Sequence, residues 1–475
     1  MTLKNTSNME SLHWDADELR TQFMQALCDM YQAEVPLYGE LVRIVREIDI
    51  TVLKAQGKSH EEFPRRNQLE RHGAIRLGTD HEMQMIKRLF ALLNMHPVGY
   101  YDLKVAGLPL HGTAFRPIDT ESLDRNPFRI FTTVLRRDLI SYTIRGTVDK
   151  ILSQRSLFTP RLCEIMNRAE KNKTMTSQQT HDLITEALKI FSWHSRSTVS
   201  IHDYLELKRE HPTVADIVCF PSAHINHLTP RTLDIELVQQ EMIRRGLPAK
   251  EVIEGPPPRD CPILLRQTSF KALEESVEFV HPNGMPVHGT HTARFGEVEQ
   301  RGAAVTRKGR ELYDQLLAGA VRNAANVSGV PLTDVLFNVF RKFPDSWEEL
   351  RARGLVCFRY SVTASGMEAA GPKPQISSRV SITHLLSLGW MEYEPITYED
   401  FLPFSAAGIF RSNLPDTSSK SQIEDSKSKS AELEAILGSQ ILDEIQIYHD
   451  LQDGSIEKCR QILGLEEIFE ERSYE

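Results

Sequence analysis

Apolar side chains recur with helical spacing at the start of the chain. They stand three or four residues apart in two successive series between residues 15 and 54, namely Leu19, Phe23 and Leu27 and then Leu37, Leu41 and Ile44. Residues at this spacing share one face of an α-helix, so the pattern predicts helices that bury one face. We therefore expect a helical N-terminal region over residues 1–56.

The next part of the chain alternates between strand-like and helical segments. β-Branched and aromatic residues predict strands, and a helical pattern separates the first two of them. The expected strands are residues 71–76, 100–105 and 128–135, and the expected helix is residues 80–93. This order of strand, helix and strands predicts a curved-sheet module with the helix on its outer side.

A similar order returns after a predicted helical insertion at about residues 153–207. The same criteria predict strands over residues 215–220 and 223–234 and a helix over residues 235–246. Pro230 lacks the backbone N–H that a central strand needs, so it should place the second strand at an edge or end it. The second half thus repeats the first in part.

The last third of the chain begins with a predicted strand and ends in a predicted tail. The strand covers residues 294–299, and the further elements are helices at 308–327, 331–340 and 347–353 and strands at 356–362 and 390–396. Residues 415–430 are rich in Ser, Lys and Asp and too polar to order themselves, which predicts a flexible linker. We expect an α+β chain with one large domain over residues 57–414 and a helical tail over residues 431–475 that docks on it.

The composition argues against two kinds of binding partner, nucleic acids and membranes. A net charge of -9 over 475 residues argues against a nucleic-acid surface, which needs a concentrated basic face. No apolar run approaches the roughly 18 residues needed to span a bilayer. The acidic N-terminus has the features of neither a signal peptide nor a transit peptide. We therefore expect a cytosolic protein without nucleic-acid or membrane partners.

The cysteines exclude some kinds of metal site. All six are scattered, and no two of them form a Cys-x-x-Cys pair. This pattern excludes a zinc ribbon and gives no support for a disulfide scaffold. Any metal site in this chain must therefore use nitrogen and oxygen ligands.

One short pattern occurs twice, with a histidine four residues before an arginine. Its two copies are Arg71-His72-Gly-Ala-Ile-Arg76 and Asn226-His227-Leu-Thr-Pro-Arg231. Alternate residues of a strand share a face, so each histidine and its arginine should point to the same side. A predicted helix follows each copy, which makes the repeat more than a chance match among 17 histidines.

A carboxylate near residue 297 completes a candidate metal site. Glu297 and Glu299 lie on the same face of their predicted strand, and spacing alone does not separate them. Gly296 allows the backbone to approach a site closely, so we prefer Glu297 and keep Glu299 as a residue that supports the ligands. Two histidines and one carboxylate hold iron while leaving coordination positions open. The rival ligands are His224, His288 and His291, the last two in a predicted loop.

Arg76 is the candidate for holding a substrate. Its long side chain can lean back toward His72, and a guanidinium group binds a carboxylate through two parallel hydrogen bonds. It should therefore meet the far carboxylate of a short dicarboxylic acid bound at the metal. The alternative is an ordinary structural ion pair. Arg231 is the weaker candidate, because Pro230 disturbs its strand.

Four blocks of this sequence resemble the 2-oxoadipate dioxygenase/decarboxylase family, also called D-2-hydroxyglutarate synthases. The blocks are Arg71–Arg76, Ile225–Ile235, the long segment Phe295–Tyr313, and Phe401-Leu-Pro-Phe-Ser-Ala-Ala-Gly-Ile-Phe410. The resemblance covers roughly residues 19–414, and the block after Phe295 is highly specific.

The resemblance implies a fold and a set of site residues. The implied core is vicinal-oxygen-chelate-like, with paired βαβββ modules forming a metal-holding β-barrel. The metal ligands would be His72, His227 and Glu297, and the substrate would contact His72, Arg76 and the backbone near Phe404. At Phe404 this chain departs from the valine expected in bacterial members.

The resemblance also implies an activity. An Fe(II)-dependent dioxygenase of this family converts 2-oxoadipate and O2 to (R)-2-hydroxyglutarate and CO2 in lysine breakdown. The substrate supplies its own electrons, so Fe(2+) is the one cofactor expected. Two other functions stay open: an O2-independent metal-dependent lyase or hydrolase on a small oxo acid, and a non-catalytic scaffold protein with structural histidines. Oxygen uptake with 2-oxoadipate separates the three.

Overall fold

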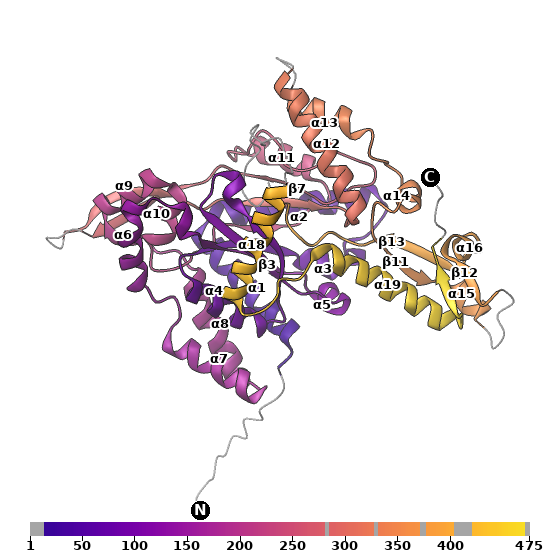
Figure 1. The fold of residues 1–475 in the computed structure, drawn as a ribbon, viewed down its shortest axis with the longest axis horizontal. Helices are drawn as coiled ribbons and strands as arrows, with labels where there is room; N and C mark the ends of the chain where they lie inside the picture. The colour runs from indigo at the N-terminus through magenta and orange to yellow at the C-terminus, as the bar shows by residue number, and fades with distance from the viewer. Residues whose placement is uncertain (1–13, 281–284, 327–330, 371–376, 403–419, 471–475) are drawn as a thin grey trace, which may run out of the picture.

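The computed structural model describes residues 14–280, 285–326, 331–370, 377–402 and 420–470 (Figure 1). It has the mixed α+β composition that the pattern predicted, with helices around several small sheets. The two predicted N-terminal helices are present as α1 (Ala16–Glu34) and α2 (Pro36–Ala55). Within the described residues, none of the helices combines the length and the apolar character needed to cross a membrane.

The largest sheet has five strands in the order β2-β3-β4-β1-β6. Its strands are β1 (Arg71–Leu77), β2 (His96–Asp102), β3 (Leu110–Arg116), β4 (Arg129–Leu135) and β6 (Leu228–Pro230). Helix α4 (Asp80–Ala91) connects β1 to β2, so β1, α4, β2, β3 and β4 form one βαβββ module. The predicted order of strand, helix and strands is confirmed for this half.

Strand β1 lies between β4 and β6, and this position brings the two histidine segments together. It runs parallel to β4 and antiparallel to β6, with His72 opposite Thr229 and Gly73 opposite Leu228. A Cβ atom at Gly73 would stand 2.5 Å from Ile225 Cδ1 and 3.1 Å from the carbonyl oxygen of His227. A larger residue at position 73 would therefore push the second segment away.

The second half supplies β7 (Leu265–Ser269) and β10 (Glu297–Arg301), which pair in antiparallel orientation. Helix α11 (Ile235–Arg244) lies between β6 and β7 in the chain. A single bridge between Arg231 and Glu299 links β6 to β10, and the amide of Thr232 donates to the carbonyl of Glu299 at 2.8 Å. Among the strands that the structure describes, these pairings do not form a closed barrel.

A third group of elements builds one end of the molecule, on the left in Figure 1. Its helices are α6 (Tyr142–Ser153), α9 (Ile201–Glu210) and α10 (Pro212–Val218), and its strands are β5 (Arg196–Ser200), β8 (Glu274–Val280) and β9 (Val287–Thr292). Their apolar side chains form a separate cluster with residues such as Val148, Tyr204 and Phe279. The remaining helices of the predicted insertion, α7 (Pro160–Asn172) and α8 (Ser177–Phe191), pack on the N-terminal core instead.

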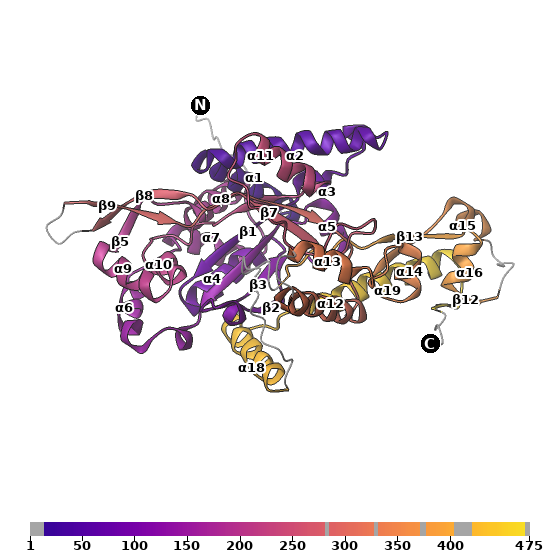
Figure 2. The ribbon, with the colours of Figure 1, turned by 90° about the horizontal axis from the view of Figure 1, so that it is seen from above.

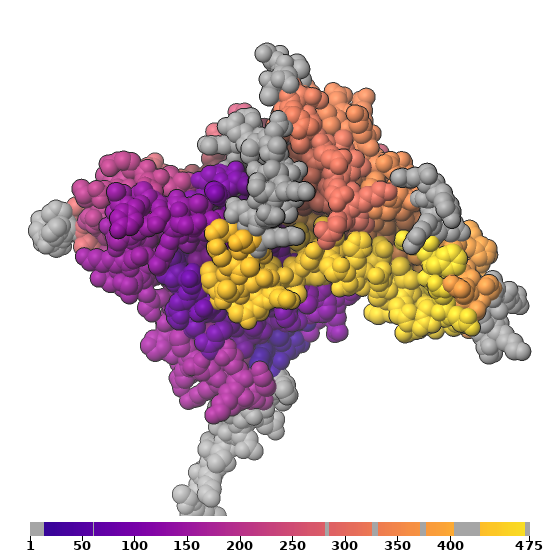
Figure 3. All heavy atoms as spheres, in the orientation of Figure 1, coloured from indigo at the N-terminus to yellow at the C-terminus, as the bar shows by residue number. Residues whose placement is uncertain are grey.

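The C-terminal elements form the opposite end and then return to the first sheet. Their bounds are α12 (Arg307–Asn326), α13 (Leu332–Phe340), α14 (Trp347–Ala352), β11 (Phe358–Val362), α15 (Ala364–Ala369), β12 (Arg379–Ser381), α16 (Ile382–Ser387), β13 (Met391–Pro395), α18 (Lys420–Leu437), α19 (Glu444–Leu463) and β14 (Glu467–Phe469). Helix α19 packs on β11 and buries Tyr448 and Cys459. Residues between α18 and α19 bond to β2 through Leu442, whose carbonyl accepts from the Gly99 amide. The docking predicted for the tail is confirmed, and Figure 3 shows the yellow tail lying across the purple N-terminal half.

Figure 2 shows how the helices surround the sheet. Helices α1 and α2 lie on one side of the molecule and α18 lies on the opposite side. The buried faces of α1 and α2 share one apolar cluster with β1, β4 and α8. The sheet therefore has apolar support from both N-terminal helices.

Several sequence predictions of secondary structure were wrong. Residues 215–220 were expected as a strand, but Pro212 begins helix α10, a favoured position for proline in the first helical turn. The strand expected over residues 223–234 is only β6, three residues that end at Pro230. The strand expected over residues 100–105 is β2, which ends at Asp102.

Other strands and one helix were missed or misplaced. Strands β3, β7, β8 and β9 were not predicted, and β9 contains the His288 and His291 that were expected in a loop. Polar residues dominate β8 and β9, so their alternation carries little hydrophobic signal. Residues 420–430, expected as part of the flexible linker, belong to α18, while residues 415–419 lie outside the described part of the chain.

A buried carboxyl on α2 predicts how stability changes with pH. Asp49 accepts hydrogen bonds from the Thr232 hydroxyl at 2.9 Å and the Leu233 amide at 2.7 Å, and burial raises its pKa to about 6. An unfolded aspartate has a pKa near 3.9, so the folded protein binds this proton more tightly and loses stability as pH rises from about 4 to about 6. Asp49→Asn should raise the free energy of unfolding at pH 7 by about 1 to 3 kcal/mol.

Urea unfolding at pH 7 and pH 4 tests this expectation. The amide oxygen of the variant can still accept both hydrogen bonds, so most of the gain should disappear at pH 4, where the carboxyl is protonated in the folded state and about half protonated in the unfolded state. An equal change at both pH values would show that the carboxylate charge is not the cause.

Candidate functional site

A cavity of about 250 Å³ lies where β1, β6, β7 and β10 meet. Three alternate residues of β1, His72, Ala74 and Arg76, line it, as the strand geometry predicted. His227, the residue just before β6, and Glu297, the first residue of β10, complete its polar wall. The apolar wall consists of Leu103, Leu108, Leu110, Phe131, Phe270, Phe295 and Phe401, together with Ile75 and Ala272.

The structure brings the three predicted metal ligands together. His72, His227 and Glu297 are buried, and each offers a ligand atom within 4.8 Å of those of the other two. His72 Nε2 lies 3.0 Å from Glu297 Oε1, and His227 Nδ1 lies 3.7 Å from the same oxygen. The two imidazole rings meet edge to face with centroids 5.3 Å apart. Two nitrogens and one oxygen thus converge at the cavity wall from β1, from the residue before β6 and from β10.

Neighbouring groups hold each of these side chains in place. The hydroxyl of Thr229 bonds to His227 Nδ1 at 2.9 Å and donates to Glu297 Oε1 at 3.0 Å. The ring of Phe295 stacks on the imidazole of His227 at 4.8 Å. Next to Glu297, a Cβ atom at Gly296 would come within 2.2 Å of the Phe270 ring. Glycine at 296 therefore lets β10 approach the cavity closely.

Burial and charge set the protonation states that a metal ion needs. Burial lowers the pKa of His227 to about 4, against the opposing effect of Glu297, so this imidazole is neutral at pH 7. Burial alone would raise the pKa of Glu297, but His227 and His72 outweigh it and leave that pKa below its ordinary value. A neutral imidazole and an ionised carboxylate are the forms that bind divalent metals.

The surroundings of Glu297 and Glu299 differ, although both lie on the same face of β10. Glu299 is fully buried and forms ion pairs with Arg129 at 2.5 Å and Arg301 at 2.8 Å. Its Oε2 atom also lies 3.1 Å from His72 Nδ1, an ion-pair contact whose alignment falls short of a hydrogen bond. Among the residues that the structure describes, Glu297 contacts His72, His227 and Thr229 but no arginine, and it lines the cavity. This contrast favours Glu297 as the ligand and Glu299 as the support of His72.

The two arginines of the repeated pattern have different surroundings. Arg76 lines the cavity, and its Nη1 atom contacts Asp216 Oδ2 at 2.6 Å. Arg231 points away from the cavity and contacts Glu70 at 2.9 Å and Asn67 at 3.0 Å. Arg231 therefore has only the structural ion-pair role that was considered as the alternative. Arg76 also forms an ion pair, but its guanidinium reaches the cavity as well.

The rival histidines are not part of the cavity wall. His224 and His291 form a separate buried cluster with Asp216, and His288 is exposed on β9. A third group that could hold a metal, His202, Asp203 and Glu206, lies mostly exposed on α9. Within the described part of the chain, the cavity histidines are His72 and His227.

Sequence reasoning missed several polar residues of the cavity. These are Thr133 on β4, Lys250 in the loop before β7, and Gln267 and Ser269 on β7. Strand β7 was not predicted, so its alternate residues could not be placed on the site. Lys250 carries no local signal, because its loop is placed at the cavity by a backbone contact with β7, in which the Lys250 amide donates to the Ser269 carbonyl at 2.8 Å.

Phe401 closes the cavity next to His72. Its ring lies 4.9 Å from the His72 ring, and its backbone exchanges hydrogen bonds with the Tyr101 hydroxyl. The preceding residue Asp400 forms a buried ion pair with Arg116 at 2.7 Å. The family block that begins at Phe401 is thus anchored at this wall. The predicted substrate contact at Phe404 lies outside the described residues.

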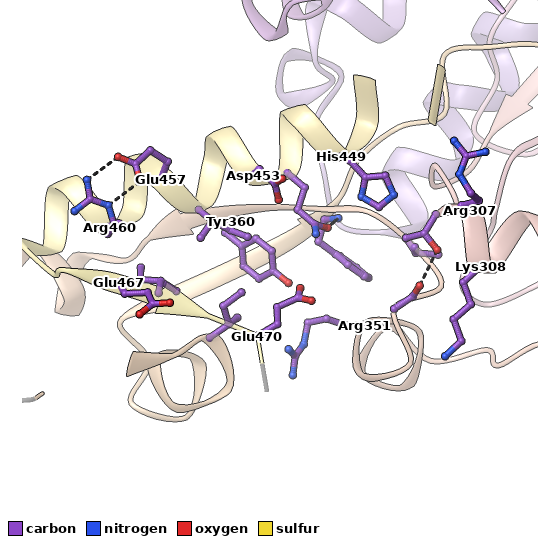
Figure 4. Close-up of a pocket in the computed structure, with 18 of the residues that line it drawn as sticks. Arg307, Lys308, Arg351, Tyr360, His449, Asp453, Glu457, Arg460, Glu467 and Glu470 are labelled. Carbon is purple, nitrogen blue, oxygen red and sulfur yellow. Dashed lines mark hydrogen bonds and ion pairs between the residues drawn. The ribbon is translucent and has the colours of Figure 1, made fainter. Parts of the chain in front are cut away.

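A larger hollow, of about 810 Å³, lies in the C-terminal part between α19 and β11 (Figure 4). Several of its charged side chains pair with each other or with residues nearby, such as Arg460 with Glu457 at 2.6 Å and Glu467 with Arg379 at 2.5 Å. None of the groups able to hold a metal, among the residues described, lines this hollow. The candidate site is therefore the smaller cavity.

Comparison with known proteins shows the family of this chain. The sequence profile of a family described as 2-oxoadipate dioxygenase/decarboxylase matches residues 23–413. The chain belongs to the 2-oxoadipate dioxygenase/decarboxylase family. Family relatives include the Escherichia coli K12 protein named 2-oxoadipate dioxygenase/decarboxylase, which is 47% identical over 94% of this chain and 98% of its own length. The Mycobacterium tuberculosis H37Rv relative of the same name is 38% identical over 84% of this chain and 87% of its own length.

Members of this family with solved structures share the fold. The Pseudomonas putida hydroxyglutarate synthase in complex with 2-oxoadipate superposes with a TM-score of 0.85 at 42% identity, covering 95% of this chain and 99% of that protein. The resemblance predicted from the four sequence blocks is thus confirmed at the level of the family.

Proposed function

We propose that this protein oxidises and decarboxylates 2-oxoadipate with O2, giving (R)-2-hydroxyglutarate and CO2. The observation that carries the proposal is a cavity in which two histidines and a glutamate converge beside a guanidinium group, within a chain of this family. The reaction balances, because both oxygen atoms of O2 enter the products and the carbon lost from the six-carbon acid leaves as CO2.

The donor set fits iron. Two imidazole nitrogens and one carboxylate oxygen from His72, His227 and Glu297 match the set that holds Fe(II) with open positions. The contact of Glu299 with His72 Nδ1 fits the support that ligating histidines receive from carboxylates. When bound, Fe(2+) supplies the redox chemistry that activates O2.

The chain's own residues bind and orient the substrate. The guanidinium of Arg76 would bind the far carboxylate of 2-oxoadipate, and the apolar wall around Leu103, Leu110 and Phe131 would exclude water from the carbon chain. His72 would contact the substrate as well as the metal, and the backbone near Phe404 is a further proposed contact. Arg76 is thus the residue that we propose selects a dicarboxylic acid.

We also propose a more specific fold and a location for this protein. The βαβββ module of β1 to β4, and the partial repeat in β6, α11, β7 and β10, support a vicinal-oxygen-chelate-like core built from two modules. The strands of these two modules would surround the metal in a barrel-like arrangement. We place the enzyme in the cytosol with 2-oxoadipate and O2 as its partners, consistent with the net charge of -9.

An oxygen electrode tests the proposed function. Anaerobically prepared protein loaded with Fe(II) should consume one O2 for each 2-oxoadipate and release one CO2. Product formation without oxygen uptake would show an O2-independent lyase or hydrolase instead. Absence of both metal binding and turnover would favour a scaffold role, and chiral chromatography of the product tests the (R) configuration.

Arg76→Ala should impair the use of dicarboxylic substrates selectively. The loss of a charge-assisted contact to the far carboxylate should lower kcat/KM for 2-oxoadipate about 10- to 100-fold. The same variant should use 2-oxohexanoate, which carries a methyl group in place of that carboxylate, nearly as well as the wild type does. Steady-state oxygen uptake with both acids measures the difference, and an equal loss with both would contradict this role of Arg76.

A further inference from the structure

Arg76 contacts a second group of buried polar side chains. One carboxylate oxygen of Asp216, on α10, forms an ion pair with Arg76, and its Oδ2 atom lies 2.6 Å from Arg76 Nη1. Its other oxygen, Oδ1, lies 3.1 Å from His224 Nε2 and 2.9 Å from His291 Nε2. These residues come from a helix, a loop and strand β9, so only the tertiary structure brings them to β1.

Aromatic side chains enclose this cluster. Trp193 meets the His224 ring edge to face at 4.8 Å and stacks over the His291 ring at 6.0 Å. The Tyr204 hydroxyl lies 3.0 Å from His291 Nδ1. Burial would raise the pKa of Asp216, but the two histidines and Arg76 outweigh it and hold that pKa well below its ordinary value. Asp216 is thus an anion in a rigid, water-poor setting.

Asp216, His224 and His291 are also close enough together to hold a metal ion. The hydrogen bonds argue against that use. A histidine that ligates through Nε2 carries its proton on Nδ1, but Nδ1 of His224 is buried and has no hydrogen-bond partner among the described residues. If His224 instead donates its Nε2–H to Asp216, Nδ1 is only an unpaired acceptor, which costs less than a buried unpaired N–H. The geometry therefore favours two imidazole donors on one carboxylate.

We propose that Asp216, held by His224 and His291, is a positioning residue that aims the guanidinium of Arg76 into the cavity. One edge of the guanidinium is tied to Asp216, and the other nitrogens stay available to a ligand. An arginine already fixed in its binding geometry loses less conformational freedom when a carboxylate binds. The cluster would thereby set the preference for a 2-oxo acid with a second carboxylate. This inference rests on the proposed function, in which Arg76 binds that carboxylate.

Asp216→Asn in the full-length, Fe(II)-loaded enzyme tests the proposal. KM for 2-oxoadipate should rise about tenfold or more, while kcat falls by less than about threefold. With 2-oxohexanoate both constants should stay within about twofold of the wild type, because that acid has no far carboxylate to place. In an Arg76→Ala background, Asp216→Asn should add almost nothing. Equal losses with both acids, or a full additional loss in the Arg76→Ala background, would overturn the proposal.

A second variant covers the case in which Asp216→Asn fails to fold. His224→Phe keeps an aromatic ring against Trp193 and Phe220 and removes one donor to Asp216. It should raise KM for 2-oxoadipate by a few-fold and leave 2-oxohexanoate unaffected. An unchanged KM for 2-oxoadipate in this variant would count against the proposal.

Anaerobic calorimetry and metal analysis separate this proposal from the proposed function. If the wild type binds 2-oxoadipate more tightly than 2-oxohexanoate but consumes no O2, the proposed dioxygenase function is wrong. In that case, loss of the binding preference in Asp216→Asn would still support the positioning role of Asp216. If the wild type shows no such preference, the positioning role is overturned. Metal content should be the same in Asp216→Asn and in the wild type, and loss of a metal equivalent would assign the cluster to a second metal site.

Discussion

His72→Ala should abolish turnover of 2-oxoadipate and release the bound iron. His72 lies 3.0 Å from Glu297 and 3.1 Å from Glu299, so its removal would take away one proposed ligand and the side chain that links Glu299 to the proposed metal site. A site left with one histidine and one carboxylate should hold Fe(II) weakly. We expect kcat/KM to fall on the order of 10³-fold or more, which corresponds to about 4 kcal/mol of transition-state stabilisation.

Oxygen uptake and the iron content after gel filtration measure this effect. His288→Ala is the matched control, because His288 is exposed on β9 and lies outside the cavity wall. That variant should keep both the iron and the activity of the wild type. Retention of stoichiometric iron and of a tenth or more of the activity in His72→Ala would exclude His72 as a ligand.

Arg129→Met should destabilise the whole protein strongly. The guanidinium of Arg129 is fully buried and contacts Glu70 at 3.1 Å, Glu299 at 2.5 Å and Glu399 at 3.2 Å. Removing one member of a buried charge network leaves its partners uncompensated, at a cost of about 3 to 5 kcal/mol. Because Arg66, Arg231 and Arg301 still lie near these carboxylates, we expect the lower part of that range.

Urea unfolding followed by circular dichroism measures the loss for Arg129→Met. Arg196→Met serves as the control, since the Arg196 side chain is 80% exposed and its contact with Glu278 is 3.4 Å long. The control should change the free energy of unfolding by less than about 0.5 kcal/mol. Equal unfolding midpoints for the two variants would contradict a structural role for the network. Since Glu299 also supports His72, Arg129→Met should bind iron more weakly as well.

Local patterns predicted the parts of the fold whose signals are local. The apolar series of α1 and α2 and the β-branched run of β4 gave correct elements, because helical and strand periodicities differ clearly over such lengths. The alternation in β1 placed His72 and Arg76 on one side, and both line the cavity. Strands β7, β8 and β9 were missed because pairing with distant partners, rather than their own hydrophobicity, makes them strands.

Local patterns predicted the candidate site only in part as well. Spacing could not separate Glu297 from Glu299, since both lie on one face of β10. Their different surroundings come from Arg129 and Arg301 beside Glu299. Arg301 lies two residues further along β10, but Arg129 comes from β4, whose pairing with β1 sets it opposite His72. The contact of Arg76 with Asp216 could not be predicted either, because residues 215–220 were expected as a strand, whereas residues 215–218 form the end of α10.

The sequence by itself determined the family, the helical N-terminal region and the residue types of the site. Those follow from motifs and periodicities that neighbouring residues carry, so they need no knowledge of distant contacts. Only the tertiary structure decided which carboxylate faces the cavity, which arginine reaches it and which buried anion holds that arginine. Each of these depends on burial and on charges contributed by segments far apart in the chain, and no local pattern encodes such long-range contacts.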